Sequence, residues 1–401
     1  MKQTFHVLSL PHTVSSKEYN ACAYTQKVVK FCKMMTERGH TVYHYGHEES
    51  DVICTEHITV LSTNDWKQCY GDHDWRKHFF KYDQNDHAYQ TFFFNAIREI
   101  GKRKTPLDFI LPFWGAGVRP ICDAHPDLIC VEPGIGYPQG HWADYKVFES
   151  YAMYHAYYGL NSVGNCQQNW YDVVIPNFFD PDDFEFKERK QDHFLYLGRV
   201  YDGKGVRIAI ETTQTLNIKL IIAGQGTLAE MGYKEVPEHV TEYGYATVEE
   251  RKRLMSNAIG TFVPSLYVEP FGGVQVESLF SGTPTITTDW GSFTENNVNG
   301  LTGYRCRTFE EFQFAAMNIL NGEIKPQDCR DFAMARFTLD VVAEKYENYF
   351  ETIMDLYKVN PDSHHNKPNG WYTNHISRWS KQMESKGVYR NPRSEVILED
   401  F

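Results

Sequence analysis

The chain has 401 residues, of which 42% are hydrophobic, 15% aromatic and 23% charged. This length predicts two or three domains, and the composition excludes a protein that is mainly disordered, collagen-like or coiled coil. Forty Lys and Arg against 52 Asp and Glu give a formal net charge of −12, which disfavours nucleic acid and anionic membranes as partners unless a local basic patch exists.

The nine cysteines are spread along the chain without a Cys-x-x-Cys pair. This distribution predicts reduced thiols and no structural zinc site. The apolar run at the start, MKQTFHVLSLPHT, is too short and too polar for a signal peptide. Nowhere do about 18 apolar residues run uninterrupted, so we expect a cytoplasmic protein with no transmembrane span.

The first part of the chain alternates predicted strands and helices. Strands are expected over 4–10, 41–45, 108–113, 127–131 and 171–177, and helices over 21–38 and 87–100. The segment 64–86 is crowded with Asp, His, Trp and Lys, so we predict mainly loop there. Glycine-bearing loops are expected at 114–117 and 133–136, each after a strand.

A second array of alternating elements follows an acidic, proline-bearing stretch, 180–192, which is the candidate linker. Strands are expected over 193–200, 218–223, 260–264 and 285–288, and helices over 206–215, 248–257 and 272–280. A long helical pattern then covers 341–357 and leads to a polar tail, part of which should pack because it contains Trp371, Tyr372 and Trp379.

This alternation predicts an α/β fold with parallel sheets covered on both faces. We expect two doubly wound, Rossmann-like domains at 1–178 and 179–340, followed by a C-terminal helix and tail at 341–401. Ligands of such sheets bind outside the carboxyl ends of the strands. The cleft between the two predicted sheets is therefore the expected site.

The stretch 263–295 is the most informative part of the sequence, because a strand is followed there by a glycine-rich helix start. Gly272 and Gly273 leave amide groups uncovered at a helix N-terminus, and such a terminus binds phosphate. Glu269 and Glu277 flank this anion site. Ionised carboxylates accept hydrogen bonds from hydroxyl groups, so these two residues point to a hydroxylated ligand such as a sugar.

A second cationic segment lies at 198–205, where Arg199 and Lys204 occupy a glycine-rich turn between a predicted strand and helix. Two positive side chains on such a turn can clamp a diphosphate. Together with the carboxylates, this turn predicts a nucleotide diphosphate that carries a hydroxylated group.

Five ordered sequence elements between 173 and 305 carry a family resemblance: VIPNFFDPDDF, the GRxxxxKG turn, the AGQG turn, EPFGGVQVE and GTPTITTDWGSFTE. With them the second half resembles the donor domain of retaining nucleotide-sugar glycosyltransferases of the GT-B architecture. It is most similar to glycosyltransferase family 4, also known as glycosyl transferases group 1.

The resemblance implies an enzyme that moves a hexose-type sugar from a UDP- or GDP-sugar to an acceptor hydroxyl, without a cofactor and without a metal. It implies that Arg199 and Lys204 hold the donor diphosphate and stabilise its charge as it leaves. Glu269 would bind hydroxyls of the transferred sugar and Glu277 those of the ribose. The other donor contacts that it implies are Gly198, Gly224, Tyr243, Tyr245, Phe271, Gly272, Gly273 and Val274. Retention in this family is usually ascribed to front-face attack.

The first half departs from the family pattern in two places. Many members have a glycine pair after the first strand, whereas residues 11–16 here contain no glycine. Many also present a histidine after the strand equivalent to 127–131, whereas this chain has Glu132, with His141 nine residues on. Glu132 is therefore the candidate catalytic residue of the first half, with its role left open.

Three other patterns have competing interpretations. Residues 224–229 fit the GxGxxA fingerprint of NAD sites, but they follow the second strand of their array and Pro237 interrupts the expected helix. Asp72-His73-Asp74 imitates a metal-binding DxD motif, but its polar surroundings favour an ordinary loop. Lys102, Arg103 and Lys104 could touch an anionic acceptor or membrane, although cations are also favoured at a helix C-terminus.

Two rival functions share the predicted architecture: a sugar-nucleotide epimerase or hydrolase, and a non-catalytic nucleotide-sugar-binding module. For a transferase, the acceptor could be a glycan, a protein, a lipid or a small molecule, while a modified base in nucleic acid is disfavoured by the charge. In the resembled family the N-terminal domain binds the acceptor and the C-terminal helix crosses back to it, and we expect both features here.

Overall fold

The computed structural model describes residues 2–78, 80, 82–161, 169 and 171–359. Residues 2–343 form one compact unit, and a second unit begins at Glu344, inside helix α12 (Leu339–Val359). The predicted tail residues Trp371, Tyr372 and Trp379 lie outside the described residues. Helix α12 confirms the helix expected over 341–357, and its return to the first domain stays a prediction.

The first sheet has seven strands in the order β3-β2-β1-β4-β5-β6-β7, and every pair of neighbours is parallel. Its strands are β1 (Thr4–Leu8), β2 (Thr41–His47), β3 (Glu56–Leu61), β4 (Phe109–Pro112), β5 (Ile129–Ile135), β6 (Tyr145–Phe148) and β7 (Val173–Val174). The helices between them are α1 (Ala23–Glu37), α2 (Thr63–Tyr70), α3 (His87–Gly101), α4 (Arg119–Asp123) and α5 (Tyr151–Asn161). All four residues of β4 are buried, which explains the uninterrupted apolar run in the sequence.

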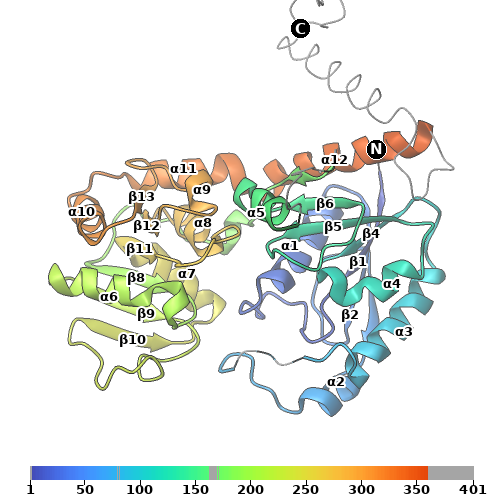
Figure 1. Cartoon of the computed structure of the whole chain (residues 1–401), viewed down its shortest axis with the longest axis horizontal. Coiled ribbons are helices and arrows are strands. Elements are labelled where there is room, and N and C mark those ends of the chain that lie inside the picture. Colours follow the sequence, from blue (N-terminus) through green and yellow to red (C-terminus); the bar gives the residue numbers. More distant parts are fainter. Residues whose placement is uncertain (1, 79, 81, 162–168, 170, 360–401) are drawn as a thin grey trace, which may run out of the picture. The chain divides into compact units, whose positions relative to one another are not determined.

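The second sheet has six parallel strands in the order β10-β9-β8-β11-β12-β13. Its strands are β8 (His193–Leu197), β9 (Lys219–Ala223), β10 (Val240–Gly244), β11 (Gly260–Val263), β12 (Thr285–Thr288) and β13 (Gly303–Cys306). The helices are α6 (Val206–Thr215), α7 (Val248–Asn257), α8 (Gly273–Phe280), α9 (Phe293–Asn296), α10 (Phe309–Leu320) and α11 (Pro326–Phe337). Figure 1 shows α6, α7 and α8 lying around this sheet, with α1, α3 and α4 around the first.

Both sheets reverse their winding direction beside their first strand. In the second sheet, β8 lies between β9, which is the next strand in the chain, and β11, which comes two strands after β9. The connections to β9 and β11 leave to opposite sides, so a crevice opens at the carboxyl ends of β8 and β11. The residues that follow these two strands, 198–205 and 264–273, are those predicted to bind a nucleotide diphosphate.

The structure corrects two predicted loops. Residues 64–70 of the stretch 64–86, predicted as mainly loop, belong to α2, while the described residues of 71–86 contain no helix or strand. Helix α2 begins at Thr63 and is capped by Ser62, whose hydroxyl accepts a hydrogen bond from the Asp65 amide. None of the residues of α2 is fully buried, which is why the sequence shows only a weak apolar pattern there. The helix is stabilised by the packing of the half-buried Trp66 and Tyr70 against the core of the first sheet. The glycine-bearing segment 133–136 mostly continues β5, which ends at Ile135.

Several elements went unpredicted: β3, β6, β10, β13, α5, α10 and α11. Two of the four strands among them, β3 and β10, contain exposed as well as half-buried positions, so they lack the uninterrupted apolar run by which strands such as β4 were predicted. The expected strand over 171–177 shrinks to two residues in β7. The helices α6 and α7 and the strand β12 have the predicted bounds.

Candidate active site

The N-terminus of α8 is shaped by two glycines. Gly272 adopts a left-handed conformation with φ 77°, and a Cβ there would lie 2.6 Å from the Phe293 ring. The next residue, Gly273, is the first of α8, so backbone amides of the first turn have no partner inside the helix. This terminus carries the positive end of the helix dipole and suits an anion.

Phe271 lies apart from the other predicted donor residues. Its side chain is 3% exposed and packs on the rings of Phe179 and Phe337. The ring therefore anchors the start of α8 in the core of the second sheet, and it does not line the cavity at this terminus.

A cavity of about 410 Å³ opens at the crossover crevice of the second sheet. It is lined by the end of β8, the end of β11, the loop between β11 and α8, and the first residues of α8. The predicted donor residues on its wall are Gly198, Lys204, Glu269, Gly272, Gly273 and Val274. Residues predicted from separate motifs thus meet in one place.

Lys204 and Glu269 form an ion pair in this cavity, with Nζ and Oε2 2.8 Å apart. The same Glu269 oxygen accepts a hydrogen bond of 2.6 Å from the hydroxyl of Ser265, which sequence reasoning missed. The Lys204 ammonium also lies 4.7 Å from the centre of the Tyr267 ring. Burial and the neighbouring Glu269 raise the pKa of Tyr267, so its hydroxyl stays protonated.

The turn that carries Arg199 and Lys204 depends on glycines at close approaches. Gly205 is left-handed with φ 69°, and a Cβ there would overlap the Pro264 carbonyl oxygen. A Cβ at Gly224 would overlap the Gly198 carbonyl oxygen, so the turns after β8 and β9 touch. The Arg199 guanidinium lies 5.3 Å from the Tyr201 ring centre, and Arg199 is absent from the described lining of the cavity.

Glu277, in the second turn of α8, lines a second cavity, of about 600 Å³. Its Oε2 atom lies 2.5 Å from the Arg251 guanidinium. Lys30 and Asn20 of the first half contribute to the same wall. Both carboxylates of the EPFGGVQVE motif are therefore paired with cations.

The two tyrosines predicted near the nucleobase lie at the end of β10 and beyond it. The Tyr243 hydroxyl donates to Glu250 at 2.7 Å. The Tyr245 hydroxyl donates to Asn20 Oδ1 at 2.5 Å, and its ring lies 5.8 Å from that of Trp75. Residues after β1 and after α2 thus contact the predicted base position, a role that no local sequence signal indicates.

Glu132 is fully buried in β5 and accepts hydrogen bonds from Tyr137 at 2.8 Å and from His141 Nδ1 at 2.9 Å. The Nε2 atom of His141 faces the Tyr137 carbonyl oxygen. Each ring nitrogen of His141 thus faces an oxygen atom, which fixes the orientation of the imidazole beside Glu132. Burial and the Glu132 carboxylate raise the pKa of Tyr137, which keeps its hydroxyl a donor.

A neighbouring buried pair, Lys27 and Glu149, also escaped prediction, and its side chains are 3% and 5% exposed. The Lys27 ammonium donates to the Gly134 carbonyl oxygen at 2.8 Å. A Cβ at Gly136 would lie 2.8 Å from a Glu149 oxygen and 3.2 Å from Pro270, so this pair adjoins the loop after Glu269. The sequence feature that could have indicated this pair is Lys27 itself, a lysine at a position of the helical pattern that faces the core.

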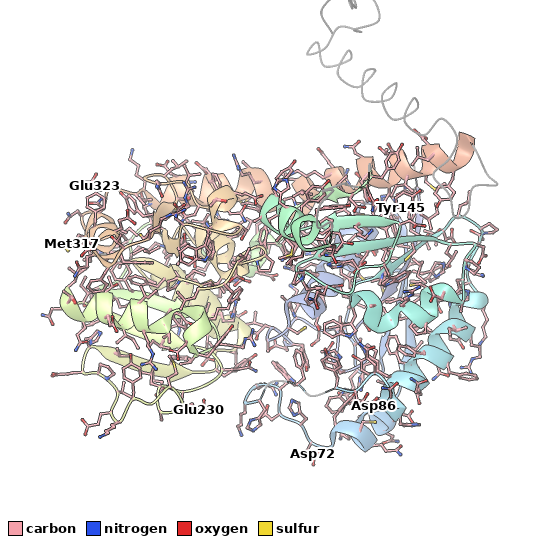
Figure 2. All side chains as sticks on the ribbon, viewed as in Figure 1. Asp72, Asp86, Tyr145, Glu230, Met317 and Glu323 are labelled. Atoms are coloured by element: carbon pink, nitrogen blue, oxygen red, sulfur yellow. The ribbon has the colours of Figure 1, made fainter. Side chains whose placement is uncertain are left out.

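The three competing patterns find structural explanations. No helix follows the turn 224–229 in the described stretch up to β10, as an NAD fingerprint would require. Asp72-His73-Asp74 lies in the connection between α2 and α3, where Figure 2 labels Asp72. The cations of 102–104 are paired: Lys102 with Glu99 at 2.7 Å, Arg103 with Glu56 at 2.6 Å, and Lys104 with Asp127.

The eight cysteines within the described ranges are free thiols, and Cys166 lies outside those ranges. In the part of the chain that the structure describes, no group of three or more His, Cys, Asp or Glu is arranged to hold a metal ion. The helices described there are all too short or too polar to cross a membrane.

Residues 179–336, which contain the first cavity, match the family described as glycosyl transferases group 1. This segment is a glycosyl transferases group 1 domain. Glycogen synthase of Mycobacterium tuberculosis is 31% identical over 184 residues, a match that covers 42% of this chain and 44% of that protein. The chain thus spans less than half the length of this curated relative.

Solved structures show the fold around the group 1 domain. Sucrose-phosphate synthase from Thermosynechococcus elongatus has a TM-score of 0.66 at 14% identity, covering 88% of this chain and 100% of that chain. Anabaena HepE in complex with UDP-glucose has a TM-score of 0.63 at 13% identity, with 88% and 100% covered. The two parallel sheets therefore have the GT-B arrangement, as the sequence motifs predicted.

Proposed function

We propose that the protein is a retaining glycosyltransferase that moves a hexose-type sugar from a UDP- or GDP-sugar to an acceptor hydroxyl, without a metal or cofactor. The observation that carries this proposal is the shared cavity of Lys204, Glu269 and the α8 N-terminus at the crossover crevice. A cation, a helix dipole and a carboxylate within one cavity match a diphosphate joined to a sugar.

In this proposal the donor separates the Lys204–Glu269 ion pair before the sugar is transferred. A donor diphosphate offers Lys204 a more highly charged partner than Glu269, and the sugar hydroxyls offer Glu269 donors in exchange. The bond between the anomeric carbon and the diphosphate oxygen breaks while the acceptor oxygen bonds to that carbon. The acceptor proton passes to the leaving phosphate oxygen, so charge is conserved. Lys204, Arg199 and the α8 amides stabilise the negative charge on the leaving group.

The comparisons support a nucleotide-sugar donor. HepE was solved with UDP-glucose, and glycogen synthase and sucrose-phosphate synthase are named for reactions that join sugars. In our proposal the first domain binds the acceptor, which is a glycan, a protein, a lipid or a small molecule, and the protein acts in the cytoplasm. Paired cations at 102–104 weaken the case for a nucleic-acid acceptor.

The test is a panel of nucleotide sugars incubated with the protein, alone and with candidate acceptors, while nucleotide release is measured. We expect release that depends on an acceptor, and a product whose anomeric configuration, read by NMR, equals that of the donor. Equal release without any acceptor would identify a hydrolase, and a changed sugar without release would identify an epimerase. Failure of every diphosphate nucleotide to bind would refute the donor site itself.

A further inference from the structure

The cavity beside Glu277 contains hydrogen-bond donors that have no acceptor. Asn20 Nδ2 is buried and has no hydrogen-bond partner in the described structure. The Lys30 ammonium has no hydrogen-bond acceptor among the described residues either, and its closest described contact is the Phe179 ring, 4.1 Å from the ring centre. The Asn20 amide nitrogen is thus a buried donor without a partner, and the half-buried Lys30 ammonium is a second donor on the same wall. An unpartnered buried donor costs free energy, so a ligand with acceptor atoms would be favoured here.

The other cations on this wall already have acceptors. Lys17 pairs with Asp183 at 2.8 Å, Arg251 pairs with Glu277, and Lys252 donates to the Asp182 carbonyl oxygen at 3.1 Å. Among the described cationic and amide groups on this wall, Lys30 and the Asn20 amide nitrogen are therefore the ones for which no acceptor is present. Both belong to the first half of the chain, whereas Glu277 belongs to the group 1 domain.

The place of this cavity follows from the proposed function, on which the present inference rests. A ribose held by Glu277 bears two substituents, the diphosphate and the base. The diphosphate belongs at the α8 N-terminus and Lys204, in the first cavity. We therefore expect the base in the second cavity, whose wall contains Lys30 and Asn20 together with Glu277. Asn20 also accepts from Tyr245, the residue expected near the base, so the two indications of the base position converge.

We propose that Lys30 and Asn20 make the donor site selective for a keto base, uracil or guanine, over adenine and cytosine. Guanine presents two adjacent acceptors, O6 and N7, and uracil presents two carbonyl oxygens. At the equivalent ring position adenine and cytosine carry an exocyclic amino group where guanine and uracil carry a carbonyl oxygen, and that amino donor would face the Lys30 ammonium without an acceptor between them. The group 1 domain thus binds the diphosphate and ribose, while the first domain selects the base.

The test is isothermal titration calorimetry of the full chain with UDP, GDP, ADP and CDP. We expect UDP or GDP to bind at least about tenfold more tightly than ADP and CDP, a difference that one hydrogen bond to a charged group supplies. In Lys30→Met the preferred nucleotide should lose about tenfold in affinity while ADP changes little, so that the preference collapses. Lys33→Met is the control, because its ammonium lies one turn along α1 and is already paired with Asp180.

The outcomes separate this inference from the proposed function. Equal affinity for all four nucleotides, or tighter binding of ADP or CDP, would overturn the base selectivity and leave the donor site intact. Failure of all four to bind would overturn both. An unchanged preference in folded Lys30→Met protein would show that other groups select the base. If Lys30→Met does not fold, the wild-type panel and Asn20→Ala still decide the question.

Discussion

Lys204 and Glu269 lie 65 positions apart in the chain, and their charged atoms lie 2.8 Å apart. Each lies in a loop after a strand that borders the crossover crevice. In the proposed function Lys204 binds the anionic diphosphate and Glu269 binds the sugar hydroxyls. In the ligand-free protein they satisfy one another, which keeps a cation and a carboxylate partly out of water without an unpaired charge. In the proposed function the donor replaces this ion pair with two sets of contacts, the diphosphate with Lys204 and the sugar hydroxyls with Glu269.

The first prediction concerns Lys204. Lys204→Met should lower kcat by about 10²- to 10³-fold, because a preorganised charge at the leaving group is lost, and should weaken nucleotide binding less. Nucleotide release under saturating donor measures this. Lys219→Met is the control, since its exposed ammonium is paired with Asp192 at 2.7 Å and Lys219 begins β9, at the opposite end of the strand from the site. Wild-type turnover in Lys204→Met would show that the motif assignment is wrong.

The second prediction concerns Glu277. Glu277→Ala should raise the Kd for UDP or GDP by about tenfold or more, because hydrogen bonds from ribose hydroxyls to a carboxylate are lost. Calorimetry with the nucleotide alone measures this without any acceptor. Glu323→Ala is a suitable control, because this exposed residue, labelled in Figure 2, lies between α10 and α11. An unchanged Kd in Glu277→Ala would show that the ribose does not bind at Glu277.

The convergence of Lys204, Glu269 and Gly273 could be predicted because it depends on local rules. Parallel strands bring their following loops to one edge, and the glycines at 272–273 and 205 mark the two helix starts. Asn20 and Lys30 could not be predicted, because their role depends on how the two sheets face each other. Helical periodicity shows which face of α1 carries Lys30, but only the tertiary structure shows which residues lie against that face.

Helix α2 and the Glu132 network illustrate a second limit. Residues 63–70 resemble a polar loop because none of them is fully buried, and the helix is held by contacts with residues distant in sequence. Glu132 is a catalytic candidate because it stands where many members of the resembled family have a histidine, and that role stays a prediction. Its carboxylate accepts hydrogen bonds from Tyr137 and His141, partners that sequence position alone does not reveal.

The third prediction concerns this Glu132 network. Glu132→Gln and His141→Gln should each destabilise the protein, by about 1 to 3 kcal/mol, because each disturbs a buried hydrogen bond and leaves a polar partner less well satisfied. The double variant should be destabilised by less than the sum of the two, and urea unfolding measures all four proteins in a double-mutant cycle. If kcat falls equally in the single and double variants, the two residues act as one unit. Strict additivity in stability would contradict a direct interaction between the two side chains.

The fourth prediction concerns the turn that carries Lys204. Gly205→Ala should destabilise the protein by at least about 2 kcal/mol, because a left-handed conformation and overlap with the Pro264 carbonyl add up. Gly322→Ala is the matched control: its φ of 75° is similar, but nothing lies within 4 Å of a Cβ there. It should cost about 1 kcal/mol in urea unfolding. Equal costs in both variants would show that the turn is not closely packed against β11.

The fifth prediction concerns Lys30 and pH. Burial lowers the pKa of Lys30 to about 8, partly offset by Glu277, Asp183 and Glu149, while Lys27 adds to the lowering. The unfolded lysine keeps its ordinary pKa of about 10.4, so between these values the unfolded chain binds more protons and this group adds stability as pH rises. Below pH 8 the folded protein bears the full cost of a partly buried cation. Lys30→Met should therefore stabilise the ligand-free protein at pH 7, by about 1 to 3 kcal/mol, and the gain should shrink toward pH 10.

Urea unfolding of wild type and Lys30→Met at pH 7, 8.5 and 10 checks this, since the difference between the two proteins removes the titration of all other groups. Lys33→Met should show no such trend, because Asp180 raises the pKa of Lys33. A gain that grows with pH would reverse the inferred sign. A stability cost that disappears when nucleotide is added would mean that the ligand supplies the acceptor that Lys30 lacks. The same residue would then lower the stability of the free protein and select the base of the donor.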